Sequence, residues 1–216
     1  MPFDVNIFDS NFNFEFKVKV ANNIRIATKA FDEFWKSNAL FLNEAEELYG
    51  RILSYSVNRQ FKKAASSTAS AFLVSGREVN SYRTKAVFLD TPDYITSICR
   101  TNSSHKLPCK AAYKSELALG NKEDSVQMEL FQDEGCETVV AIPKKYAILG
   151  YRYVNGKMEH MNIVVPDWEY KSILHSENLL NNLSEYYNYV PEELVEETVA
   201  SLKNDITKEA QKQNII

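Results

Sequence analysis

The sequence predicts an α+β fold in which N-terminal and C-terminal helices pack on a mainly antiparallel sheet. Apolar residues recur at helical spacing toward both ends of the chain, whereas short segments rich in β-branched and aromatic residues fill its middle. An Asn-Gly pair between two such segments is the preferred turn of a β-hairpin. The 216 residues contain no internal repeat and no Gly/Ser-rich or Pro-rich linker, so we expect a single domain over residues 1–210 and a frayed tail at residues 211–216.

The N-terminal part is predicted to form a strand followed by two helices. Residues 11–20 alternate apolar and polar side chains without interruption, which is the period of a half-buried strand. Asn22 and Asn23 then offer N-caps for a helix whose apolar stripe includes Phe31. Residues 43–63 open with a capping box and end in two lysines, and both features favour a second helix.

The middle of the chain is predicted to consist of strands with one short helix among them. Strands are expected at residues 71–74, 81–89, 94–99, 126–131 and 138–142. The short helix is expected between Pro108, which suits the first helical position, and Gly120, which suits a C-cap.

The clearest predicted element is a hairpin whose strands, residues 146–154 and 157–165, meet at Asn155-Gly156. A two-residue turn defines the register, so Arg152 is expected directly opposite Glu159. Both faces of this strand pair are largely apolar, which places the hairpin inside the sheet and not at a free edge.

After Pro166 the sequence predicts a return to helix. Residues 168–183 form the first predicted helix, and Pro191 opens the second. The second helix has two acidic residues in its first turn and an apolar stripe that includes Val195 and Leu202.

Positive charge is concentrated in the middle of the chain. Residues 51–114 contain eleven Lys or Arg and three acidic residues, a local balance of +8 in a protein of net charge −4. The rest of the chain therefore carries −12, and this segregation indicates an anionic partner for the middle segment. The alternative is that these charges pair with the acidic C-terminal helices of the same protein.

A polar loop from Arg100 to Pro108 leads into the predicted short helix. Backbone N–H groups at a helix start, next to cations and serine hydroxyls, would suit a phosphate or a carboxylate. The candidate anion-binding residues are Arg77, Arg83, Lys85, Arg100, Ser103, Ser104, His105, Lys106, Lys110 and Lys114.

The segment Gln127-Met128-Glu129-Leu130-Phe131 resembles the short peptide by which many bacterial proteins dock on the replication sliding clamp. In this resemblance Gln127 would hydrogen-bond at the rim of the clamp pocket, while Met128, Leu130 and Phe131 would fill apolar pockets. The alternative is a half-buried strand, because the same residues alternate between apolar and polar. Leu130 and Phe131 would then belong to the core, where no clamp reaches them.

Motifs for enzyme chemistry are missing from the sequence. The three cysteines and three histidines have no metal-ligand spacing, and a Cys99/His105/Cys109 cluster would need a fourth ligand. There is no phosphate-binding glycine loop, no nucleophile elbow and no acidic pair of a restriction-type nuclease. Ser103 and Ser104 lie beside His105 without an identifiable orienting acid. We therefore expect no metal, no cofactor and no catalytic residue, although an enzyme is not excluded.

These observations favour a cytoplasmic, non-enzymatic binding or regulatory protein of prokaryotic or phage type. It would engage nucleic acid or a nucleic-acid-bound protein, with a sliding clamp as a candidate partner. No apolar run is long enough to span a bilayer and the N-terminus has no signal-peptide pattern, so no membrane partner is expected. Two alternatives stay open: an enzyme acting on a phosphorylated or anionic small molecule near Pro108, and a dedicated inhibitor of one protein. The sequence leaves the oligomeric state and the choice between DNA and RNA open.

Overall fold

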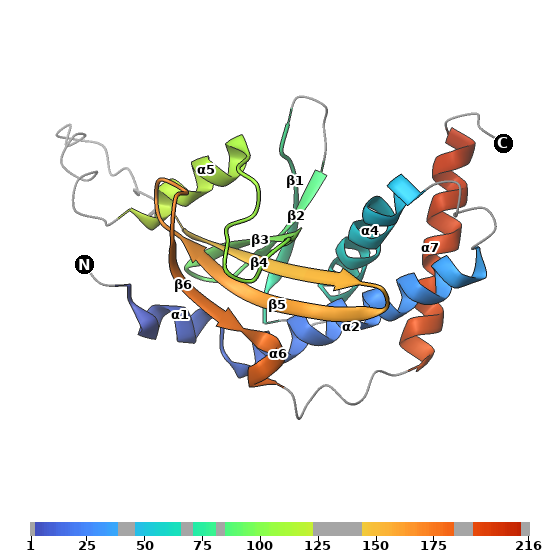
Figure 1. Ribbon diagram of the computed structural model, residues 1–216, viewed down its shortest axis with the longest axis horizontal. Coiled ribbons are helices and arrows are strands. Elements are labelled where there is room, and N and C mark those ends of the chain that lie inside the picture. The colour runs from blue at the N-terminus through green and yellow to red at the C-terminus, as the bar shows by residue number, and fades with distance from the viewer. Residues whose placement is uncertain are drawn as a thin grey trace, which may run out of the picture.

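Within the described residues, six strands form one sheet in the order β1-β2-β3-β4-β5-β6 (Figure 1). The computed structural model describes residues 3–38, 46–65, 71–80, 85–122, 144–183 and 192–212. The strands are β1 (Leu73–Glu78), β2 (Lys85–Asp90), β3 (Tyr94–Arg100), β4 (Lys145–Val154), β5 (Lys157–Pro166) and β6 (Ile173–Asn178). All neighbours are antiparallel except β3 and β4, which are parallel. The chain between β3 and β4 must therefore cross from one end of the sheet to the other.

Helices cover both faces of this sheet. They are α1 (Val5–Asn11), α2 (Phe14–Ser37), α4 (Glu46–Ala64), α5 (Ala112–Ala118) with the 3₁₀ turn η1 (Leu119–Asn121), α6 (Leu179–Asn182) and α7 (Glu192–Lys212). Figure 1 shows α2 running along the sheet, with α4 and α7 at one end of the molecule and α5 near the other. The predicted fold class, an α+β fold with a mainly antiparallel sheet, is confirmed.

Apolar side chains form three separate clusters. The main cluster joins α1, α2 and α4 to one sheet face and includes the fully buried Phe12 and Leu149. A smaller cluster under α5 includes Ala118 and Tyr146 on the other face. The third cluster joins α2 to α7 and includes the fully buried Leu202. Because α5 and α4 cover opposite faces, residues on alternate positions of β3 reach different surroundings.

The strand predicted at residues 11–20 is wrong, because α1 and α2 occupy that region. Asn13 caps α2 by accepting a hydrogen bond from the Phe16 backbone N–H at 2.9 Å. Phe12, Phe16 and Val20 are fully buried, whereas Phe14 is 54% exposed. In a segment that alternates apolar and polar residues, positions four residues apart are apolar as well. Such positions lie on one face of a helix, so the alternation also fits an apolar helical stripe.

The helix predicted at residues 168–183 is also wrong, since β6 and the short α6 lie there. Asp167 starts a turn in which its carboxylate accepts hydrogen bonds from the backbone N–H groups of Lys171 and Ser172 at 2.7 and 3.0 Å. The chain then reverses and β6 pairs with β5. Sheet pairing thus overrides the local preference for helix.

The hairpin at Asn155-Gly156 is confirmed, but its predicted register holds only next to the turn. A register shift between Arg152 and Tyr153 places Arg152 opposite His160 instead of Glu159. The Arg152 guanidinium still pairs with the Glu159 carboxylate. As predicted, both hairpin strands lie inside the sheet.

Helices α4 and α7 confirm the two helices predicted for those regions, and β1, β2 and β3 are present with shifted bounds. Helix α5 begins four residues after the predicted Pro108 start, and Ala111 at its N-cap provides no side-chain cap. The strands predicted at residues 126–131 and 138–142 lie outside the described residues. The division into a domain over residues 1–210 and a tail at residues 211–216 stays a prediction.

Candidate anion-binding site

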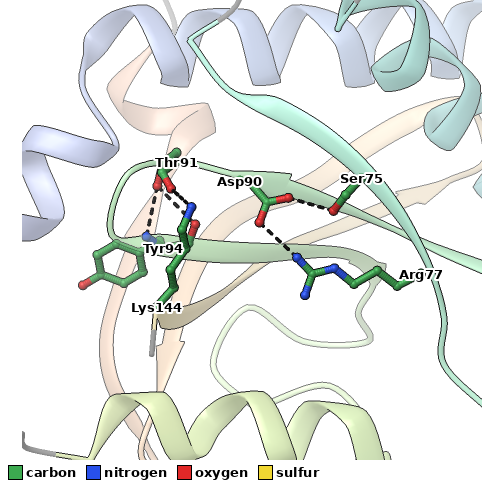
Figure 2. A network of polar contacts seen from close by, with 6 residues as sticks. All are labelled: Ser75, Arg77, Asp90, Thr91, Tyr94 and Lys144. Carbon is green, nitrogen blue, oxygen red and sulfur yellow. Dashed lines mark hydrogen bonds and ion pairs between the residues drawn. The ribbon is translucent and has the colours of Figure 1, made fainter. Parts of the chain in front are cut away.

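The ten residues predicted to bind an anion lie in several places on the molecule. Arg77 lies on β1, where its guanidinium pairs with Asp90 at 3.2 Å and lies 5.1 Å from the centroid of the Phe88 ring. Figure 2 shows this pair, in which Asp90 also accepts a hydrogen bond from the Ser75 hydroxyl at 2.7 Å. The same view shows the turn after β2, where Thr91 contacts Tyr94 and Lys144. Because it pairs with Asp90, the Arg77 guanidinium already has a carboxylate partner within the protein.

Three further predicted residues point to different surroundings. The Arg100 guanidinium lies against Gly50 of α4, where an added Cβ would clash with it. Lys114 is buried on α5 and donates a hydrogen bond to the Cys109 carbonyl oxygen at 3.1 Å. Lys85 lies at the start of β2 and lines a cavity between α4 and α7. Arg83 lies outside the described residues.

The remaining predicted residues belong to the loop after β3, and three of them meet around one open hollow. His105, Lys106 and Lys110 line this hollow of about 490 Å³ together with Lys171 and Ser172 from the turn before β6. We call it the loop hollow; its other described lining residues are Leu107, Pro108, Cys109, Tyr170 and Ile173. The structure thus brings together a group of three lysines, a histidine and a serine that sequence reasoning identified only in part.

The loop is attached to the sheet beneath it by hydrogen bonds. The Thr101 hydroxyl lies 2.6 Å from Nε2 of the buried His160 on β5. Burial lowers the pKa of His160, and the nearby Arg152 guanidinium lowers it further. The Asn162 side-chain amide donates to the Ser104 carbonyl oxygen at 3.2 Å. Ser103 accepts a hydrogen bond from the His105 backbone N–H at 3.1 Å, so both serines help to shape the loop.

The second wall of the hollow is the turn formed by residues 167–172. Tyr170 is buried, has a φ of 57°, and donates from its hydroxyl to the Pro108 carbonyl oxygen at 3.2 Å. Burial would raise the pKa of Asp167, but hydrogen bonds from Ser172 and Lys171 lower it on balance. These contacts hold the turn and the loop together. The Lys171 ammonium group pairs with Glu169 at 2.8 Å and is largely exposed.

A second and larger cavity, of about 660 Å³, lies between α4, α7 and the start of β2. We call it the α4–α7 groove; its charged lining residues are Arg59, Lys62, Lys63, Lys85 and Glu197. Arg59 pairs with Asp205 of α7, and Lys63 pairs with Glu197 of α7. These two cations of α4 thus pair with an acidic C-terminal helix of the same protein, which is the alternative to an anionic ligand that the sequence left open.

The loop hollow differs from the groove in its charge balance. Within the described part of the chain, His105, Lys106 and Lys110 form no ion pair, and none of the described residues that line the hollow is a carboxylate. Cations without a carboxylate partner around an open hollow can hold a phosphate or a carboxylate of a ligand.

The described residues show no cluster that could hold a metal ion, and their two cysteines differ in exposure. No group of three or more His, Cys, Asp or Glu side chains among them could hold a metal ion. Burial raises the pKa of the Cys99 thiol to about 11, so this thiol stays protonated at neutral pH. Cys109 is exposed at the loop hollow.

Sequence reasoning missed Lys171 and Ser172, because it assigned residues 168–183 to a helix. The signal that could have found them is Pro166-Asp167, since an aspartate after a proline favours a turn. The docking residues Gln127, Met128, Leu130 and Phe131 lie outside the described residues, so their role stays a prediction.

No protein-family model, curated protein or solved structure matches this chain. The described helices include none with both the length and the apolar character needed to cross a membrane.

Proposed function

We propose that this protein is a non-enzymatic binding protein that engages nucleic acid by contacting its phosphates at the loop hollow. The observation that carries this proposal is the cluster of His105, Lys106 and Lys110, which lack carboxylate partners in the described chain although the protein is acidic overall. Lysine, serine and loop N–H groups are the usual contacts of proteins to phosphate oxygens. The resemblance of residues 127–131 to a clamp-docking peptide is consistent with a partner from the machinery that processes nucleic acid. In this proposal the protein acts in the cytoplasm of a prokaryote or its phage.

The surroundings of the loop hollow support binding over catalysis. An enzyme acting on an anionic small molecule would need a general base near the bound anion. His105 is the described lining residue that could act as such a base, but no carboxylate among these residues orients its imidazole, and Arg100 lies against α4 instead of in the hollow. For the inhibitor alternative, Glu197 and Asp205 of α7 are already paired with α4, whereas Glu192 and Glu193 are exposed.

The proposal is tested by fluorescence anisotropy with labelled single-stranded and duplex oligonucleotides between about 50 and 200 mM salt. We expect affinity to fall with salt, with a slope of about −1.4 in log K against log salt if Lys106 and Lys110 contact a single strand. The double variant Lys106→Gln/Lys110→Gln should bind more weakly and reduce that slope by about 1.4.

The matched control is Lys29→Gln/Lys157→Gln, which removes two exposed lysines of α2 and the hairpin tip. Lys157 and the turn at residues 167–172 lie at opposite ends of β5, which at ten residues spans about 33 Å. The control should bind like the unmodified protein. An affinity that does not change with salt, or equal losses in the two double variants, would overturn the proposal.

A further inference from the structure

We propose that the nucleic acid is single-stranded and that one of its bases stacks on Trp168 beside the loop hollow; this inference rests on the proposed function. Trp168 is 42% exposed and lies two residues before Tyr170, which lines the hollow. The Lys122 ammonium group lies 5.0 Å from the centroid of the Trp168 ring. Proteins bind single strands without sequence preference by combining aromatic rings with positive charge, and Trp168 has a lysine at its ring and lies on a turn that borders a basic hollow.

The two tryptophans of the chain have very different surroundings. Trp35 packs in the core cluster against the rings of Phe31 and Tyr49, with centroids 5.6 and 5.0 Å away. Trp168 has no aromatic ring packed against it within the described residues. The core therefore explains the position of Trp35, whereas a stacked ligand base would explain an indole held at the surface.

The turn that carries Trp168 is rigidly closed. The Asp167 backbone N–H donates to the Ser172 carbonyl oxygen at 2.9 Å, and the Asp167 carboxylate accepts from the Ser172 hydroxyl at 2.6 Å. The Tyr170 hydroxyl joins this turn to Pro108 in the loop. The backbone that carries Trp168 is thus fixed relative to the loop before the ligand arrives, which lowers the entropy cost of binding.

The geometry favours a single strand over a duplex. Bases in a duplex are stacked on each other, and a protein side chain reaches their faces only after unstacking. Reading the major groove requires a helix or a two-stranded ribbon. The described walls of the hollow are instead a loop and a turn, and α5 next to the loop has only seven residues.

The experiment uses Trp168 as its own reporter. The variant Trp35→Phe leaves Trp168 as the single tryptophan, because the chain has two. We titrate this variant with oligothymidylate, with oligouridylate and with a duplex of the same length. Either single strand should quench the fluorescence strongly, whereas the duplex should bind more weakly and quench little.

In the unmodified background, Trp168→Ala should lose about tenfold in affinity for the single strands and keep its affinity for the duplex. Trp168→Phe should retain most of the single-strand affinity, since a phenyl ring also stacks. If Trp168→Ala does not fold by circular dichroism, the quenching of Trp35→Phe decides alone.

The outcomes separate this inference from the proposed function. Salt-dependent binding that needs Lys106 and Lys110, but shows no Trp168 quenching and no preference for single strands, overturns the stacking alone. Binding that is insensitive to both lysines overturns the proposed site. If neither strand form binds the unmodified protein, both proposals fail.

Discussion

The α4–α7 groove and the loop hollow are both rich in basic residues, but their charges meet different partners. In the groove, Arg59 and Lys63 of α4 are paired with carboxylates of α7. In the loop hollow, Lys106 and Lys110 have no carboxylate partner within the described residues. These four cations come from the same positively charged segment of the sequence. A local excess of positive charge is therefore weak evidence for an anionic ligand until it is known which cations the protein already neutralises.

The pairing of charges in the groove depends on the contacts that hold α7 beside α4. The prediction with the largest expected effect tests whether these contacts are mainly apolar. Leu202 is fully buried in the cluster between α2 and α7. Leu202→Ala should lower the free energy of unfolding by about 3 kcal/mol, because it removes buried methyl groups and leaves a cavity. Asp205→Asn should cost less than about 1 kcal/mol, since the paired Arg59 side chain is 39% exposed. Urea denaturation of both variants gives the two values, and equal losses would contradict a mainly apolar attachment of α7.

The second prediction concerns a variant in which the cations of the groove lack carboxylate partners, as Lys106 and Lys110 do in the loop hollow. Glu197→Gln/Asp205→Asn removes the two carboxylates that pair with α4, so the freed cations become available to an anionic ligand. Oligonucleotide affinity should rise, and the salt slope for a single strand should steepen by about 1.4 if both freed cations contact phosphates. The control Glu192→Gln/Glu193→Gln removes the same charge from exposed residues in the first turn of α7. A similar gain in the control would show an effect of net charge instead of local pairing.

The smallest expected effect concerns the histidine beneath the loop hollow. Burial lowers the pKa of His160, and burial also lowers that of His175. As pH falls below about 6.5, the unfolded chain takes up these protons before the folded protein does, so stability decreases. Above about pH 7 both states are neutral and this contribution vanishes. The slope is at most about 1.4 kcal/mol per pH unit for each histidine.

Urea denaturation at about pH 7.5 and about pH 5.5 measures this decline. His160→Gln should make it shallower, because the titrating group that bonds to Thr101 is gone. A decline equally steep in His160→Gln would contradict the assignment to His160.

Part of the candidate site was predictable because its residues are neighbours in the sequence. Lys106 lies in the predicted polar loop and Lys110 follows it closely in the sequence, so both were identified. Trp168 and Lys171 were not, because their positions depend on a turn at Asp167 and on the pairing of β6 with β5. The fold shows the same limit, since the hairpin turn was predictable whereas the register shift beside Arg152 was not.

The sequence by itself determined the features that arise from contacts between near neighbours along the chain. These are the fold class, helices α4 and α7, the turn at Asn155-Gly156 and the excess of positive charge in the middle segment. Only the tertiary structure decided which cations are neutralised, because an ion pair depends on distances between remote residues. Arg59 and its partner Asp205 are 146 positions apart. No local sequence pattern shows whether two such residues lie close together. For Lys106 and Lys110, the presence or absence of a remote carboxylate partner distinguishes a neutralised loop from a binding site.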